Sequence, residues 1–169
     1  QRQMCIRDRA YLGHARLIAL AKQYDVQIDM KPIDLAKLFS VSGGLPLAKR
    51  PPQRQAYRLV ELKRWSAHLG LPLNLQPKFS PASGDAASKL IIATKFAHGT
   101  DAALQLTGAI MHAFWADDKN IMDSDTLAGL ANDAGYDGAA LVKASETTSV
   151  QNEYDQFTND AMACLLYTS

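Results

Sequence analysis

The sequence has little cysteine and no long apolar run. Its two cysteines, Cys5 and Cys164, each lie within six residues of an end of the 169-residue chain. This placement excludes a disulfide framework, a CxxC redox centre and a thiolate-rich zinc site. No apolar run approaches the length of a membrane-spanning helix, and residues 1–9 carry three arginines but no apolar stretch of a secretory signal. A cytoplasmic protein without a membrane partner is the default expectation.

The composition is that of one folded domain with an uneven distribution of charge. Hydrophobic residues make up 47% and charged residues 21% of the chain, and the net charge is +1. Residues 1–78 contain 14 lysines and arginines against 5 aspartates and glutamates, whereas residues 79–169 contain 4 against 12. The basic half can bind an anion locally, or the two halves can face each other or solvent. Both interpretations stay open.

Helical periodicity dominates the sequence. Apolar residues recur at helical spacing, Asp123–Asp125 offer N-caps, Gly135 offers a stop, and Thr148 with Gln151 fits a capping box. The segments predicted as helices are residues 11–24, the stretch from Pro51 and Pro52 to about Leu69, residues 87–94, 101–116, 127–134 and 148–161.

One segment follows a different period. Apolar and polar residues alternate over residues 26–31, and Pro32 closes the run, which predicts a half-buried strand. A strand needs partners for its backbone groups, and no second convincing strand is found. The sequence therefore predicts a mainly α fold with an incomplete sheet, whose remaining strands lie outside this chain.

The stretch of residues 49–64 holds six basic residues and one acid. On a helix Arg54, Arg58, Glu61 and Trp65 share one face. Guanidinium groups beside an aromatic ring at the edge of a core suit a small carboxylate ligand. The alternative is that Glu61 pairs with Arg58 while the arginine stems lie along the surface. Nucleic acid is not expected as a partner, because aromatic residues are not interleaved with the basic ones.

The other polar motifs do not indicate a metal or phosphate site. The glycines after Ser42 lack the remainder of a phosphate-binding loop, and the aspartates near Asp117 do not follow the spacing of a calcium loop. The histidines also lack metal-ligand spacing. They are His14, His68, His98 and His112.

Several segments in order resemble 2-hydroxychromene-2-carboxylate isomerases. They are residues 11–17 (YLGHARL), 30–35 (MKPIDL), 52–58 (PQRQAYR), 62–65 (LKRW), 70–75 (GLPLNL), 114–116 (FWA) and 127–135. These isomerases are similar to kappa-class glutathione transferases and DsbA-like oxidoreductases, and they have a thioredoxin-like fold with a helical insertion.

The resemblance implies a single DsbA-like domain over residues 10–163. Residues 10–34 would form part of the thioredoxin-like region, 35–146 the helical insertion and 147–163 the returning helix. Residues 1–9 and 164–169 resemble neither the family nor a natural helix end, and we expect them to be non-native ends of a fragment.

The resemblance also implies a glutathione-dependent isomerase acting on an aromatic catabolic intermediate. In the family a serine holds the glutathione thiolate, but Arg7 stands at the matching position, so no catalytic residue is assigned and little or no activity is expected of this chain. A kappa-class transferase or DsbA-like thiol oxidoreductase is an alternative. A non-catalytic helical module that docks an acidic partner is another.

The expected ligands are glutathione and a small aromatic carboxylate, with no metal, and homodimer formation is left open. A basic residue of the family's glutathione site falls on Arg54. Arg54, Arg58, Trp65 and Tyr11 are therefore the candidate binding residues.

Overall fold

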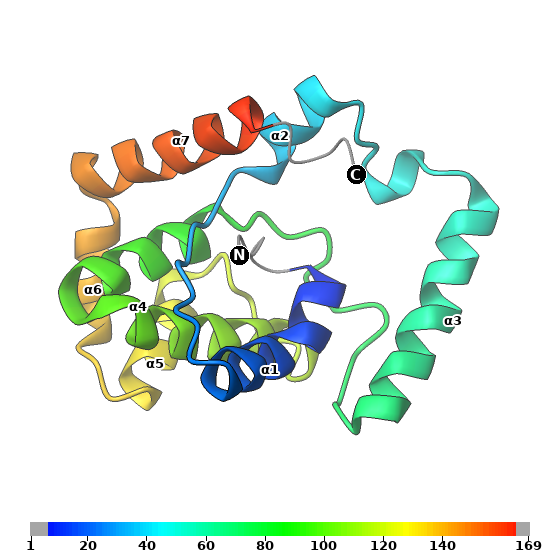
Figure 1. The fold of residues 1–169 in the computed structure, drawn as a ribbon, viewed down its shortest axis with the longest axis horizontal. Coiled ribbons are helices and arrows are strands. Elements are labelled where there is room, and N and C mark those ends of the chain that lie inside the picture. Colours follow the sequence, from blue (N-terminus) through cyan, green and yellow to red (C-terminus); the bar gives the residue numbers. More distant parts are fainter. Residues whose placement is uncertain (1–6, 165–169) are drawn as a thin grey trace.

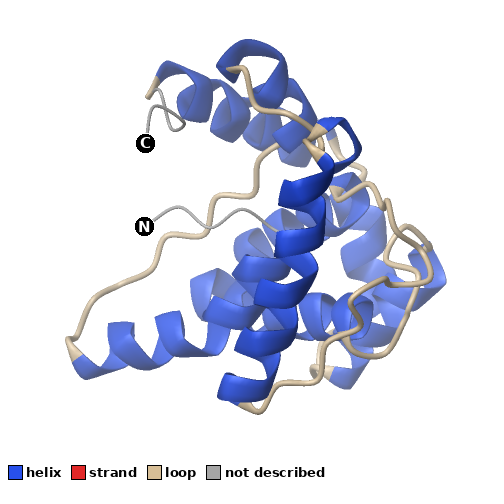
Figure 2. Ribbon diagram, turned by 90° about the vertical axis from the view of Figure 1, so that its right-hand side faces the viewer, coloured by secondary structure: helices blue, strands red, loops and turns tan. Residues whose placement is uncertain are grey.

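The computed structural model describes residues 7–164, which form helices joined by loops (Figures 1 and 2). The elements are α1 (Asp8–Gln23), α2 (Leu35–Ser42), the 3₁₀ turn η1 (Leu47–Lys49), α3 (Pro52–Leu69), α4 (Asp85–Trp115), α5 (Ser124–Asp133), α6 (Gly138–Ser145) and α7 (Thr148–Ala163). The predicted mainly α fold class is confirmed. None of these helices is long and apolar enough to cross a bilayer. Of the expected non-native ends, residues 1–9 and 164–169, the structure describes Arg7 as N-cap and Asp8 and Arg9 as first residues of α1, and Cys164 as C-cap of α7. Residues 1–6 and 165–169 lie outside the described range.

Helix α4 is the central element of the packed body. It contacts α1, α5, α6 and α7, and its fully buried side chains include Leu106, Ile110 and Met111. At Gly99 the backbone leaves the helical region with φ 87° and ψ 178°, a conformation that favours glycine. The two helices predicted over residues 87–94 and 101–116 are thus the two halves of α4.

A second apolar cluster joins α2 and α7 to the first half of α4. Its buried members include Leu38, Ile92 and Phe157. Figure 1 shows α2 and α7 beside each other at the top of the molecule. Helix α7 begins at Thr148 with Thr147 as N-cap and no side-chain cap, so the predicted capping box is wrong.

The predicted strand over residues 26–31 is not formed. The segment leads from α1 to α2 as irregular extended chain, and residues 7–164 contain no strand (Figure 2). The expected alternation of buried and exposed residues holds only in the second half of the segment. Met30 is fully buried and Ile28 half-buried, whereas Val26 is 60% exposed. Without a second strand among the described residues, the backbone of this segment has no ladder to join.

Helix α3 stands at one edge of the molecule (Figure 1). It begins at Pro52, where the missing N–H of proline costs nothing, and ends before Gly70, whose φ is 64°. Leu62 is its fully buried residue, and α1 is the helix against which it packs. This arrangement sets the basic face of α3 opposite the start of α1.

Candidate functional site

A cavity of about 190 Å³ lies where the N-terminus of α1 meets α2, η1 and α3. Its charged lining consists of Arg7, Asp8, Arg9, Arg50 and Arg58, and its apolar lining of Leu35, Phe39, Leu47 and Trp115. Four guanidinium groups therefore surround one carboxylate beside apolar walls. We call this feature the arginine cavity. Its excess of positive charge at a helix N-terminus favours an anion.

Asp8 fixes Arg58 in the cavity. The Arg58 Nε atom donates to Asp8 Oδ2 over 2.6 Å, and the two side chains are 15% and 8% exposed. The backbone N–H of Arg9 donates to the other Asp8 oxygen over 2.7 Å. Hydrogen bonds between charged groups are short and strong, and partial burial reduces their screening by salt. Arg58 is consequently held in one position.

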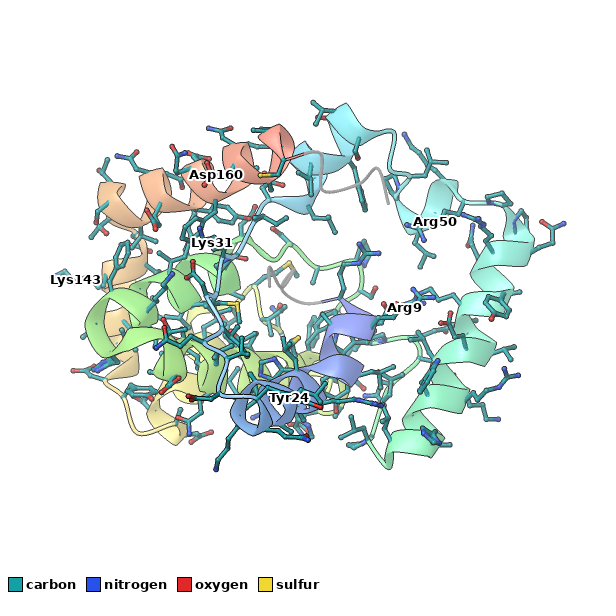
Figure 3. All side chains as sticks on the ribbon, viewed as in Figure 1. Arg9, Tyr24, Lys31, Arg50, Lys143 and Asp160 are labelled. Carbon is teal, nitrogen blue, oxygen red and sulfur yellow. The ribbon has the colours of Figure 1, made fainter. Side chains whose placement is uncertain are left out.

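Glu61 pairs with Arg9 rather than with Arg58. The guanidinium of Arg9 donates to both carboxylate oxygens of Glu61, with its Nε 3.3 Å from Oε1. The hydrogen bond that Arg9 donates to Glu61 raises the pKa of Arg9. Figure 3 shows Arg9 reaching from α1 toward α3. The alternative in which Glu61 neutralises Arg58 within α3 is therefore wrong.

Arg7 and Arg50 are the cavity's cations without a carboxylate partner among residues 7–164. Arg7 is the N-cap of α1, and its guanidinium carbon lies 5.9 Å from the centre of the Phe39 ring. Burial lowers the pKa of Arg7, and the neighbouring arginines add to this effect while Asp8 opposes it. Arg50 donates from Nε to the carbonyl oxygen of Leu45 over 3.0 Å. These two guanidinium groups are available to an anionic ligand.

The structure separates the four predicted binding residues. Arg58 lines the arginine cavity, but Arg54 is exposed and does not. Trp65 is 45% exposed and lines a different groove between α1 and α3. Tyr11 is buried, and its hydroxyl donates to the carbonyl oxygen of Pro72 over 2.8 Å and lies 3.3 Å from His112 Nδ1. The predicted face of α3 is therefore divided between two features.

Sequence reasoning missed Asp8, Arg9 and Arg50 as site residues. Arg50 belongs to the basic stretch that the charge count singled out, and the alternation of charges over residues 7–9 marks the start of a helix. No local signal brings these two segments together, because more than 40 residues separate them.

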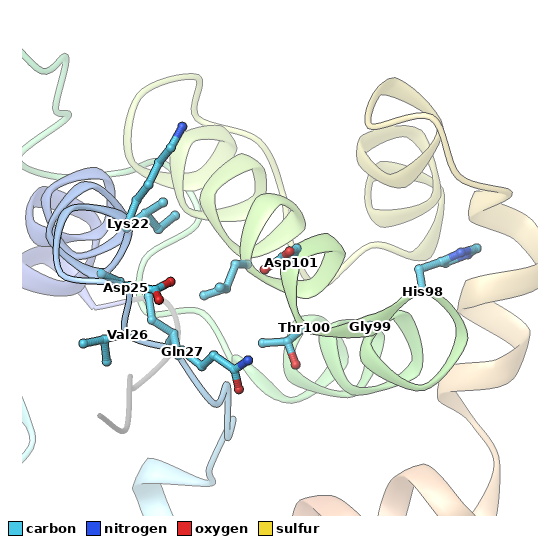
Figure 4. A pocket seen from close by; sticks show the side chains of 12 residues that line it. Lys22, Asp25, Val26, Gln27, His98, Gly99, Thr100 and Asp101 are labelled. Carbon is cyan, nitrogen blue, oxygen red and sulfur yellow. The ribbon is translucent and has the colours of Figure 1, made fainter.

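A larger cavity, of about 660 Å³, lies elsewhere, between the C-terminal end of α1, the loop after it and α4 near Gly99 (Figure 4). Its charged lining is mixed, with Lys22 beside Asp25 and Asp101. No group of three potential metal ligands occurs among residues 7–164. The size of this larger cavity alone selects no ligand, whereas the arginine cavity combines an excess of positive charge with apolar walls.

The profile of the DSBA-like thioredoxin domain matches residues 10–166. The chain belongs to this family. It is also similar to "Uncharacterized protein YwbO" of Bacillus subtilis (strain 168), with 27% identity over 143 residues that cover 84% of this chain and 68% of the relative.

Among solved structures, a 2-hydroxychromene-2-carboxylate isomerase has a similar fold. The superposition gives a TM-score of 0.72 at 21% sequence identity and covers 96% of this chain and 77% of the isomerase. At this identity the likeness establishes the fold alone.

Proposed function

We propose that this chain is a glutathione-dependent isomerase of the 2-hydroxychromene-2-carboxylate type that binds ligand carboxylates in the arginine cavity. The observation that carries the proposal is the pair of guanidinium groups, Arg7 and Arg50, which have no carboxylate partner among residues 7–164 and lie beside the fixed Arg58–Asp8 pair. Arginine recognises carboxylates through two parallel hydrogen bonds. The fold shared with a solved isomerase supports the assignment.

The volume of the cavity limits what it can enclose. Sites that enclose a whole small molecule measure about 300–1,000 Å³, and this cavity measures about 190 Å³. It therefore suits the carboxylate end of a ligand, with the remainder lying along its mouth. Phe39 and Trp115 supply apolar surface beside that end.

In the proposed reaction the glutathione thiolate adds to a conjugated carbon of the substrate. Rotation about the transient single bond follows, and elimination restores both the double bond and the thiol, so no glutathione is consumed. A helix N-terminus and neighbouring arginines lower a thiol pKa, and Arg7 occupies this end of α1. A guanidinium group does not replace the small serine hydroxyl of the family. We therefore expect this chain to bind glutathione but to have little isomerase activity.

Titration of glutathione by calorimetry tests the binding step. We expect Arg50→Gln to weaken binding about tenfold, since a hydrogen bond to a charged group contributes about 1.5–3 kcal/mol. Arg54→Gln is the matched control, because Arg54 lies four residues away, is exposed and does not line the cavity. Equal effects of the two substitutions, or a larger effect at Arg54, contradict the assignment of glutathione to this cavity.

The reaction itself is followed by the absorbance change of 2-hydroxychromene-2-carboxylate with and without glutathione. We expect Arg7→Ser to increase the glutathione-dependent rate over that of the unaltered chain, because a hydroxyl then faces the thiolate. Formation of a glutathione conjugate instead of a rearranged product supports the transferase alternative. A CxxC-dependent oxidoreductase is disfavoured, since the two cysteines are Cys5 and Cys164.

A further inference from the structure

A groove of about 210 Å³ runs between α1 and α3 on the opposite side of the Arg9–Glu61 pair from the arginine cavity. Its apolar surface comes from Leu12, Leu69 and the half-exposed Trp65. Gly13 lies on the α1 side, and a Cβ atom added there meets no atom within 4 Å. Because Gly13 has no side chain, the groove is open at a place that any other residue at this position would fill.

The size of the groove suits a side chain rather than a free small molecule. It is smaller than the roughly 300 Å³ at which pockets begin to enclose drug-sized ligands, and it is apolar at its base. An exposed tryptophan at the rim of such a groove is typical of the residues that dominate the energy of protein–protein contacts. One large apolar side chain of a partner fits this description.

The charged residues that line the groove indicate the charge of the partner segment. Arg16 lines the groove and is exposed. Within residues 7–164 Arg16 has no carboxylate within ion-pair distance. Glu61 is the one acid of the groove, and Arg9 already neutralises it. A complementary surface must supply carboxylates.

We propose that the groove between α1 and α3 docks an acidic segment of a partner protein, which inserts one large apolar side chain beside Trp65 and pairs a carboxylate with Arg16. The arginine cavity takes no part in this contact. The inference therefore stands independently of the isomerase activity.

Selection from a library of random 12-residue peptides displayed on phage, panned against the immobilised full chain, tests the proposal. We expect the enriched peptides to carry a net negative charge and one aromatic or large aliphatic residue. Failure to enrich above a blank surface overturns the proposal, and so does enrichment of basic or uncharged peptides.

Gly13→Leu is the blocking variant, since leucine is compatible with a helix and its side chain enters the open groove. Gly129→Leu is the matched control, because Gly129 also lies within a helix, in α5, with no atom within 4 Å of an added Cβ. We expect synthetic copies of the enriched peptides to bind Gly13→Leu at least tenfold more weakly than Gly129→Leu. Equal binding to both variants overturns the proposal.

A second variant tests the charges without filling the groove. We expect Arg16→Glu to weaken peptide binding at least tenfold and to reduce its dependence on salt. Lys22→Glu, on the same helix but outside the groove, should leave binding within twofold. Circular dichroism of each variant reports folding, so a loss of binding in a folded Arg16→Glu protein is specific. Binding of anionic vesicles, or self-association of the chain that Gly13→Leu abolishes, identifies a different occupant and overturns the proposal.

Discussion

The packed body around α4 and the basic edge formed by the start of α1, by η1 and by α3 are built on different interactions. In the body, side chains such as Leu106 and Ile110 are fully buried among other apolar groups. At the edge, Arg58 and Asp8 are partly buried and hold each other by charge, while Tyr57 and Val60 of α3 remain exposed. Apolar burial is non-directional and roughly follows area, whereas an ion pair depends on one particular partner. The body therefore tolerates exchange of similar apolar residues, and the edge depends on individual atoms.

The largest expected effect comes from removing apolar volume in the body. Leu106→Ala deletes a fully buried side chain of α4 and should lower the free energy of unfolding by about 3 kcal/mol. Val60→Ala removes apolar atoms from a residue of α3 that is 53% exposed, and its effect should stay below about 0.5 kcal/mol. Urea denaturation followed by circular dichroism measures both. Similar losses in the two variants would abolish the distinction between the regions.

The next largest expected loss in the free energy of unfolding comes from breaking the ion pairs of the edge. Arg58→Met removes the closer charged partner of the Asp8 carboxylate, whose side chain is 8% exposed, and leaves it Arg9 at 4.0 Å. We expect a loss of about 2–3 kcal/mol. Glu61→Gln breaks the more exposed pair with Arg9 and should cost less than about 1 kcal/mol.

The same denaturation experiment includes the double variant Asp8→Asn with Arg58→Met. We expect it to be more stable than Arg58→Met alone, because the buried carboxylate that lost its closer charged partner is gone. If the double variant is the less stable of the two, the loss in Arg58→Met arises from packing of the arginine stem rather than from the buried carboxylate.

This comparison also explains which features the sequence predicts. The helices of the body carry their signal locally, as in the stripe of Val150, Tyr154, Phe157 and Ala161, all of which are buried in α7. The partner of Arg58 carries no such signal. Glu61 is three residues away on the same helix and is the partner that local rules favour, yet Asp8, 50 residues earlier, takes its place.

The interpretation of residues 26–31 fails for a related reason. Alternation reports one buried face, which Met30 provides by packing into the body. Alternation does not show whether a second segment lies alongside to form backbone hydrogen bonds, and strand pairing requires two segments. Helices α2 and α6 were also not singled out, although Asp34 and Asp137 cap them through their side chains. Each is eight residues long, too short for a clear period.

A smaller effect separates a buried histidine of the body from an exposed histidine of the edge. Burial lowers the pKa of His14, and its hydrogen bond with the carbonyl of Leu104 opposes this shift. The unfolded chain, with an ordinary histidine pKa of about 6.5, therefore binds a proton at a higher pH than the folded protein does. The free energy of unfolding should be fully retained above pH ~6.5 and fall as the pH drops below that value toward the lower pKa of the folded state.

Urea denaturation between pH 5 and 8 measures this dependence. His14→Gln should flatten it, because glutamine does not titrate in this range. His68→Gln, at an exposed residue near the end of α3, controls for the exchange of a histidine for glutamine as such. A slope that persists in His14→Gln assigns the dependence to other groups.

The smallest expected effect tests whether the two regions differ in local helix stability at all. Gly13 in α1 faces the groove at the edge, and Gly129 in α5 belongs to the body. Neither would bring an added Cβ within 4 Å of another atom. Alanine at either position should therefore raise the free energy of unfolding by about 0.5–1 kcal/mol, through helix propensity alone. Equal gains, measured as shifts of the urea midpoint at constant slope, place the difference between the regions in their tertiary contacts. A gain at Gly129 with a loss at Gly13 would instead mean that the open groove in α1 is needed for the fold itself.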